Sequence, residues 1–389
     1  MIMKIIQEKS IENVFLQIDR ILEKYELNPN ETIISLSGGY ALNCPTNFDI
    51  MDRYKFKEMM CAPCVNDGGL SIGMGLYFFK KFMDSFIYKF EGAFYGYDDR
   101  KNFADTVDIY RDYISDVSEN VKKISDDILK SPILWLDGNA EIGPRALGHR
   151  SIIADARNKD HKDLLNIYKQ REWWRPVAPI VLAEDIGDWF EDSYLSPYML
   201  HNFTVKAEKA EIIPAVLHFD LTARVQSLKR EDNESLYNVI REIKEKTNVP
   251  IVCNTSMNDK GEPIINTLAE AINFALRKKI GIIYAYGHRI VLKNHDLYTE
   301  MKWLKRNDWP FVNHRRDRES VMKKYNPFRL PYQDFLVYMF NPQLRKMDIT
   351  KEKDYKKVES MIKKMKLLGS NLIIFEEWGK KIGEGDIEA

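Results

Sequence analysis

EIGPRALGHRSIIADARNKDHKDLLNIYKQREWWRP, residues 141–176, is the stretch from which our prediction of fold and function starts. The stretch contains Arg145, Arg150, Arg157, Lys169, Arg171 and Arg175, although the chain as a whole balances 58 Lys and Arg against 58 Asp and Glu. Guanidinium groups suit phosphate and carboxylate oxygens, so this local cluster indicates a pocket for a small, densely anionic substrate. A surface network of ion pairs is the alternative, because exposed charge clusters are common. Gly143, Gly148, Trp173 and Trp174 favour the pocket, since tight turns and paired tryptophans are unusual in a solvated charge run.

The composition is that of an ordinary globular protein. The chain has 389 residues, of which 44% are hydrophobic and 30% charged, so we expect two or three domains. It has no apolar run long enough to span a bilayer, and charges interrupt its first residues, so we predict a cytoplasmic protein that does not act at a membrane. Cys61 and Cys64 form one CxxC pair without the second pair of ligands that a zinc site needs. The balanced charge gives no general attraction to nucleic acid.

Two strand-to-helix units are expected near the N-terminus, after an amphipathic helix at 10–25. In the first, a strand at 32–36 ends in Gly38 and Gly39, and a helical pattern begins at Tyr40. Strand, double glycine and helix is a geometry that can hold phosphate, because glycines allow close approach and a helix N-terminus attracts anions. A plain strand-to-helix connection is equally consistent with it.

The second unit has a strand at 56–61, a turn, and Asp67 at the head of a helix that runs through Phe79. Asp67 is expected either to cap that helix or to present a carboxylate to a metal ion. Residues 84–102 are aromatic and irregular, as expected for a linker, and helical segments are predicted from there to Leu129.

Buried strands are predicted at 133–136, 180–182 and 250–253, and two short strands within 280–293. Helices are predicted at 236–246 and 269–279. Alternation places five polar residues on one strand face, which is either solvated or the wall of a pocket: His218, Asp220, Thr222, Arg224 and Gln226. The polar run 254–263 can bond phosphate or ribose oxygens, or simply build a turn. From 297 onward we expect helices near 317–324 and 351–367, a strand at 371–375 and no catalytic pattern.

Four motifs then stand in order along the chain: SGGYALN (37–43), APCVNDGG (62–69), GPRALGHRS (143–151) continuing to YKQREWWRPVAP (168–179), and TARVQ (222–226) with NTSMNDKGEPI (254–264). Together they closely resemble the O-carbamoyltransferases of antibiotic tailoring and nodulation-factor modification. This resemblance implies an α/β (α+β) fold with three parts. They are the C-terminal portion of an actin-like ATPase domain at 1–90, a YrdC-like domain at 91–296, and an extension at 297–389 that we expect to contact a partner.

The resemblance also implies an activity. In that family, carbamoyl phosphate and ATP give carbamoyl-adenylate and pyrophosphate, and the carbamoyl group then passes to a small hydroxylated acceptor near a bound iron ion. By motif, the implied catalytic residues are Arg145, Lys169, Arg175 and Arg224. The implied substrate and nucleotide residues are Gly38, Gly39, Asn43, Arg150, Arg171, Asn254, Ser256 and Asn258. Asp67 matches the metal-ligand aspartate, and the implied cofactors are ATP, Mg²⁺ and Fe²⁺.

One departure from the family pattern shapes the predicted partner. Family members carry, before SGGxALN, further actin-like sequence with two metal-ligand histidines one helical turn apart. None of the seven histidines here has a second histidine four residues away. We therefore expect a second polypeptide to supply that lobe and the iron ligands, giving a split O-carbamoyltransferase for natural products. The alternative is a non-catalytic interaction or regulatory subunit, against which the intact basic set argues. An RNA-modifying threonylcarbamoyl enzyme is disfavoured, because the motif-bearing region lacks a basic face interleaved with aromatic residues.

Overall fold

The computed structural model describes residues 2–83, 85–88, 91–119, 121–172, 174–299, 323–331, 334–335, 337–338, 341 and 344–367. The chain divides into two compact units, Met1–Leu304 and Lys305–Ala389. All of the motifs that resemble the carbamoyltransferases lie in the first unit. No helix in these described ranges combines the length and apolar character needed to cross a membrane.

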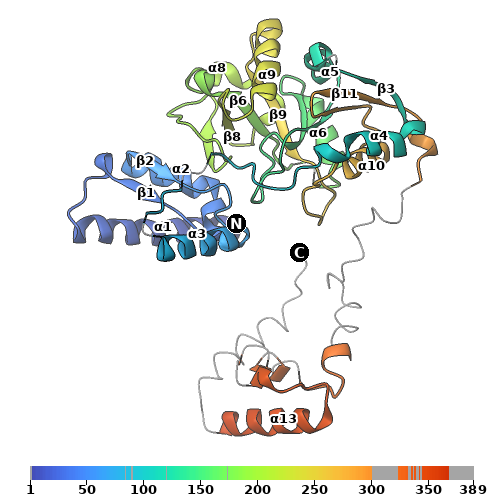
Figure 1. The fold of residues 1–389 in the computed structure, drawn as a ribbon. Helices are drawn as coiled ribbons and strands as arrows, with labels where there is room; N and C mark the ends of the chain where they lie inside the picture. The colour runs from blue at the N-terminus through green and yellow to red at the C-terminus, as the bar shows by residue number, and fades with distance from the viewer. Residues whose placement is uncertain are drawn as a thin grey trace. The chain divides into compact units, whose positions relative to one another are not determined.

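A mixed sheet forms the centre of the first unit (Figure 1). Among the described residues it has nine strands in the order β3-β11-β10-β4-β5-β9-β6-β8-β7. Their bounds are β3 (Ile114–Ser118), β4 (Ile133–Leu136), β5 (Arg150–Asp155), β6 (Ala178–Leu182), β7 (His201–Thr204), β8 (Thr222–Leu228), β9 (Ile251–Ser256), β10 (Ile282–Ala285) and β11 (His288–Leu292). The pairs β10–β4 and β6–β8 are parallel, and the other neighbours are antiparallel.

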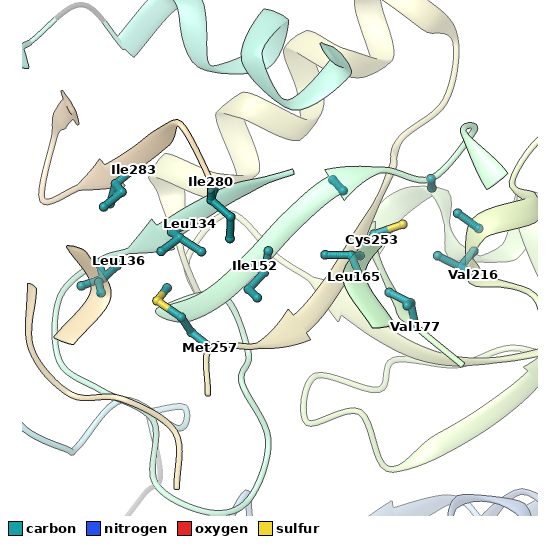
Figure 2. Close-up of a cluster of buried hydrophobic side chains, with 14 of the residues drawn as sticks. Leu134, Leu136, Ile152, Leu165, Val177, Val216, Cys253, Met257, Ile280 and Ile283 are labelled. Atoms are coloured by element: carbon teal, nitrogen blue, oxygen red, sulfur yellow. The ribbon is translucent and has the colours of Figure 1, made fainter. Parts of the chain in front are cut away.

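Helices cover both faces of this sheet, because alternate side chains of each strand point to opposite faces. The helices are α4 (Phe103–Ile109), α5 (Ile124–Lys130), α6 (Lys159–Tyr168), α7 (Ile186–Trp189), α8 (Ala207–Ala210), α9 (Glu234–Thr247) and α10 (Leu268–Lys278). Leu134 of β4 belongs to the core cluster that includes residues of α6 and α10, whereas Trp135 belongs to the cluster of α5 and α9. Figure 2 shows side chains of the first cluster, including Leu134, Ile152 and Leu165.

The N-terminal segment has its own small core. It comprises α1 (Ile2–Lys24), β1 (Ile33–Ser35), α2 (Cys44–Tyr54), β2 (Glu58–Met60) and α3 (Leu70–Phe82), with β1 and β2 paired in parallel. Ile18, Ile50, Met51 and Phe56 are buried together. Asn47 of α2 donates its Nδ2 hydrogens to Ala41 O and to Leu200 O, at 2.8 and 2.9 Å. The second of these bonds ties the segment to the large-sheet domain.

The second unit, taken by itself, contains a small apolar core. Its helix α13 (Glu352–Leu367) contributes Val358 and Ile362, and the remaining buried members are Leu330, Val337, Leu344 and Ile349. The predicted helix at 351–367 is therefore confirmed. The strand predicted at 371–375, and most of the helix predicted near 317–324, lie outside the described residues.

The predicted α/β (α+β) fold class is confirmed, and so are most of the predicted elements of the large domain. The prediction of helices up to Leu129 is wrong for residues 114–118, which form strand β3 against β11. Strand β5 was not anticipated. Within 218–226, the strand begins only at Thr222, because Leu221 adopts a positive φ of 62° that ends the preceding turn.

Candidate active site

The four motifs converge at the junction between the N-terminal segment and the large sheet. Gly38 N donates to Val65 O at 2.7 Å, which joins the first motif to the second. Gly143 lies against the second motif with a φ of +92°, and a Cβ there would come within 2.4 Å of Pro63 O. Only glycine fits this position without displacing backbone. Segments separated by about 80 residues are thereby held in direct contact.

Glu141 holds the loop that carries Arg145. Its Oε1 accepts three backbone hydrogen bonds, from Leu147 N at 2.7 Å, His149 N at 2.9 Å and Arg150 N at 3.1 Å. A carboxylate that collects several N–H groups fixes the backbone around it, since each buried N–H needs an acceptor. Sequence reasoning missed Glu141. The signal was an acidic residue two positions before a glycine-rich loop whose amides need acceptors.

Three side-chain amides bind the carbonyl groups of the same loop. Asn254 Nδ2 donates to Ala146 O at 2.9 Å, Gln226 Nε2 to Leu147 O at 2.7 Å, and Asn233 Nδ2 to Gly148 O at 3.1 Å. The loop is thus tied on both its N–H and its C=O groups, which presents Arg145 from a rigid frame.

Arg145 and Arg224 form a pair of like charges. The Nε atoms of both are buried, and neither has a hydrogen-bond partner among the described residues. Burial, followed by repulsion from the charge of Arg145, lowers the pKa of Arg224 to about 10. Two neighbouring cations raise the energy of the free protein, and an anion bound by both would relieve it.

Lys169 lies at the C-terminal end of α6 and is 6% exposed. Its Nζ donates to Ser256 O at 2.6 Å, to Ser256 Oγ at 2.9 Å and to Asn258 Oδ1. These acceptors are neutral, so they do not compensate the charge. Burial, followed by repulsion from Arg171, lowers the pKa of Lys169 to about 7. Lys169, Ser256 and Asn258, which the sequence predicted as site residues, are therefore in mutual contact.

Arg171 and Arg175 extend this basic region. Arg171 Nε donates to Asn166 Oδ1 at 2.5 Å, and burial together with the charge of Arg175 lowers the pKa of Arg171 to about 10. Arg175 is half exposed and pairs with Glu172 through a 2.8 Å contact. Arg175 would have to leave Glu172 in order to bind an anion directly.

Arg150 has a different role from the predicted one. It is fully buried, and its guanidinium donates to five backbone carbonyl groups: those of Tyr97, Asp137, Gly138, His149 and Asn266. Since a guanidinium has five N–H groups, none is left for a ligand. These contacts argue against the prediction that Arg150 binds substrate, and the residue connects the segments around the loop.

The predicted nucleotide residues lie in the first motif. An added Cβ on Gly38 or Gly39 would meet no atom within 4 Å, so the backbone there is open to a ligand. Asn43 caps α2 by accepting from Thr46 N at 3.3 Å, and its Nδ2 donates to Gln7 Oε1 at 2.9 Å. Both sides of the Asn43 amide are therefore engaged within the protein, and nucleotide binding by these three residues stays a prediction.

Asp67 is exposed in a 3₁₀ turn, Asp67–Gly69, directly before α3. Within the described ranges, no group of three or more His, Cys, Asp or Glu residues lies close enough together to hold a metal ion. The residues present therefore do not form an iron site by themselves, and Asp67 would need ligands from elsewhere.

Comparison with known proteins finds carbamoyltransferases among the proteins that this chain is similar to. Residues 126–293 match the family model described as carbamoyltransferase C-terminus. The matched part of the chain is thus similar to O-carbamoyltransferases. Arg145, Arg224, Lys169 and the loop that carries Arg145 all lie within the residues that match this carbamoyltransferase model.

Individual relatives extend the similarity beyond that model. Nodulation protein NolNO of Sinorhizobium fredii is 35% identical over 252 residues, which is 61% of this chain and 37% of the relative. Nodulation protein NolO of Bradyrhizobium diazoefficiens is 32% identical over 257 residues, 62% of this chain and 46% of the relative. The 3'-hydroxymethylcephem-O-carbamoyltransferase of Streptomyces clavuligerus is 30% identical over 258 residues, 65% of this chain and 47% of the relative. The chain thus spans about half the length, or less, of these three relatives.

Proposed function

We propose that this chain forms carbamoyl-adenylate from carbamoyl phosphate and Mg·ATP, and that it contributes to transfer of the carbamoyl group to a hydroxyl of a small molecule. The observation that carries the proposal is the Arg145–Arg224 pair, whose buried Nε atoms have no hydrogen-bond partner among the described residues. A structural role gives no reason to bring two cations together in this way, because their repulsion destabilises the free protein.

The reaction requires two polyanions to meet. Hydrolysis of carbamoyl phosphate gives carbamate and phosphate, and a carbamate oxygen then attacks the α-phosphorus of ATP and displaces pyrophosphate. One water is consumed, and one phosphate and one pyrophosphate are released. Fixed cations reduce the repulsion between the reactants and stabilise the charge on the departing pyrophosphate.

We assign the residues as follows. Arg145 and Arg224 bind the phosphate of the donor, since the buried Nε atoms of both lack a hydrogen-bond partner among the described residues. Lys169 binds the ATP phosphates, and Ser256 and Asn258 hold its ammonium group in place. Arg171 lies next to Lys169 and adds positive potential, and Arg175 joins the anion site after it leaves Glu172.

The acceptor is proposed as a small hydroxylated natural product. The relative from Streptomyces clavuligerus is named for a hydroxymethyl group that it carbamoylates, and two other relatives are nodulation proteins. By analogy, the acceptor here presents a hydroxyl group.

We further propose that a second polypeptide completes the transfer site. Helix α3 exposes a broad apolar surface, with Leu70, Met74, Tyr77, Phe78 and Phe82 each 61 to 68% exposed. Beside it, the β1–β2 pair is a two-stranded parallel sheet of three-residue strands. Parallel sheets are normally covered on both faces and are rarely stable with two strands. A partner lobe that adds strands and buries α3 would also supply the co-ligands that Asp67 lacks.

The test is carbamoyl-phosphate-dependent release of pyrophosphate by the purified chain with ATP and Mg²⁺. We expect release that requires carbamoyl phosphate and that falls by at least about 100-fold in Arg224→Met, the loss typical of removing one electrostatic stabiliser. Arg230→Met is the matched control, because Arg230 pairs with Glu234 on the surface. Absence of release, both for the chain alone and for the complex purified with its partner, would contradict the proposal.

A further inference from the structure

Asn254 carries an unused hydrogen-bond acceptor at the centre of the candidate site. The residue is 1% exposed. Its Nδ2 donates to Ala146 O at 2.9 Å and to Gln226 Oε1 at 3.0 Å. Its Oδ1 is buried and has no partner among the described residues. A buried carbonyl oxygen of this kind normally accepts a hydrogen bond, so we expect a bound ligand to supply the donor.

The orientation of the Asn254 amide follows from its neighbours. Leu147 O can only accept, so Gln226 must present its Nε2 to it, at 2.7 Å. Gln226 therefore presents its Oε1 to Asn254, and Asn254 must donate to it with its Nδ2. Ala146 O is a second obligatory acceptor for the same Nδ2 group. Both hydrogens of Asn254 are thus used, and Oδ1 is the atom left over.

The unused oxygen lies near the arginine pair. Asn254 of β9 pairs with Ala178 of β6, and Ile180 of β6 pairs with Gln226 of β8. Arg224 precedes Gln226 by two residues, as Ala178 precedes Ile180, so Arg224 and Asn254 lie at one level of the sheet on either side of Ala178. Two strand spacings separate their backbones by roughly 10 Å. Ala178, whose side chain is a methyl group, is the residue between them in the sheet. Arg145 is the residue before Ala146, to which Asn254 is bonded.

Phosphate cannot satisfy this oxygen. Phosphate oxygens are acceptors at neutral pH, and an acceptor facing Oδ1 would be repelled. Because both Nδ2 hydrogens are engaged, Asn254 has no donor to offer a phosphate, which argues against the phosphate-binding role that the motif implies. The matching group is an N–H donor on a small anionic ligand.

We propose that Asn254 Oδ1 accepts a hydrogen bond from the NH₂ group of the carbamoyl donor, while Arg145 and Arg224 bind its phosphate. This inference rests on the proposed function, since it takes carbamoyl phosphate as the donor. It makes Asn254 the residue that distinguishes a carbamoyl phosphate from an acyl phosphate. Acetyl phosphate has the same phosphate and carbonyl groups but a methyl group in place of NH₂, so it would leave Oδ1 buried and unpaired.

The experiment compares the Kd of carbamoyl phosphate with that of acetyl phosphate by calorimetry on the full chain. We expect the wild-type protein to prefer carbamoyl phosphate by about 10-fold or more, the order of one buried hydrogen bond. Asn254→Ala should reduce this preference to about 2-fold or less. Asn233→Ala is the matched control, because Asn233 ties the same loop through Gly148 O but has its Oδ1 engaged by Leu236 N at 2.9 Å. It should weaken both ligands alike and keep the preference.

The outcomes separate this inference from the proposed function. Equal preference in Asn254→Ala and in the wild-type protein would overturn the inference. Preference for carbamoyl phosphate that disappears only in Asn254→Ala supports it, even if no pyrophosphate is released and adenylation therefore fails. Binding of neither ligand by the wild-type protein would refute both. A preference lost equally in Asn254→Ala and Asn233→Ala would assign the effect to loop position and also overturn the inference.

Discussion

Replacement of Arg224 by methionine should stabilise the free protein while weakening anion binding. Burial and the charge of Arg145 lower the pKa of Arg224 from its ordinary value to about 10. Such a depression means that the charged form is disfavoured by roughly 3 kcal/mol in the native state. Methionine fills much of the same space without a charge. We therefore expect Arg224→Met to raise the free energy of unfolding by roughly 1–3 kcal/mol in the absence of ligand.

The assay is thermal unfolding with and without inorganic phosphate. A gain of this size should raise Tm by several degrees for a domain of this length, and phosphate should no longer stabilise the variant. Arg289→Met is the control, since Arg289 makes a bidentate pair with buried Asp127 at 2.6 and 3.0 Å. Removal of Arg289 should instead cost about 3–5 kcal/mol. If Arg224→Met destabilised the free protein as strongly as Arg289→Met does, Arg224 would have a protein partner and the reasoning would be refuted.

Three further predictions follow from single contacts. Because the pKa of Lys169 is about 7, the affinity for Mg·ATP should fall as pH rises through 7. The free protein should grow more stable above pH 7, because the unfolded chain still holds that proton. Titration calorimetry with Mg·ATP should show the affinity change in the wild-type protein but not in Lys169→Arg, and an equal change in both would exclude Lys169. Glu141→Ala leaves three backbone N–H groups without their acceptor. Urea unfolding should therefore show that the free energy of unfolding falls by at least about 3 kcal/mol, and by less in Glu141→Gln. Equal losses below about 1 kcal/mol in both variants would contradict the role of Glu141. Gly143→Ala would place a Cβ 2.4 Å from Pro63 O and should lower Tm far more than Gly261→Ala does. Gly261 is the control because it has a similar positive φ but open space around it. A similar loss of Tm in both variants would show that the contact between the motifs is not needed for stability.

The sequence predicted the elements whose patterns are local. The amphipathic helix at 236–246 and the strands at 133–136 and 250–253 follow from periodicity and apolar runs, and the structure has α9, β4 and β9 there. Strand β3 was taken for helix because its partner β11 lies about 170 residues away in the chain, and only that pairing settles its conformation.

The basic set of the site was also visible in the sequence, whereas the use of each member was not. Arg145 and Arg150 look alike in the motif GPRALGHR. Only three-dimensional contacts show that Arg150 bonds five backbone carbonyl groups, while the Nε of Arg145 has no described partner. The role of Glu141 likewise depends on three backbone amides that come together only in the folded loop.

Direct binding of carbamoyl phosphate tests the central claim, that the unpaired arginines form the donor site. Calorimetry should be carried out on the full chain, on Arg145→Met and Arg224→Met, and on Arg230→Met as the surface control. We predict measurable binding to the wild-type protein and to Arg230→Met, and affinity weaker by at least about 10-fold in each site variant, as expected for loss of a charged hydrogen bond. Unchanged affinity in both Arg145→Met and Arg224→Met would contradict the account and move the donor site elsewhere.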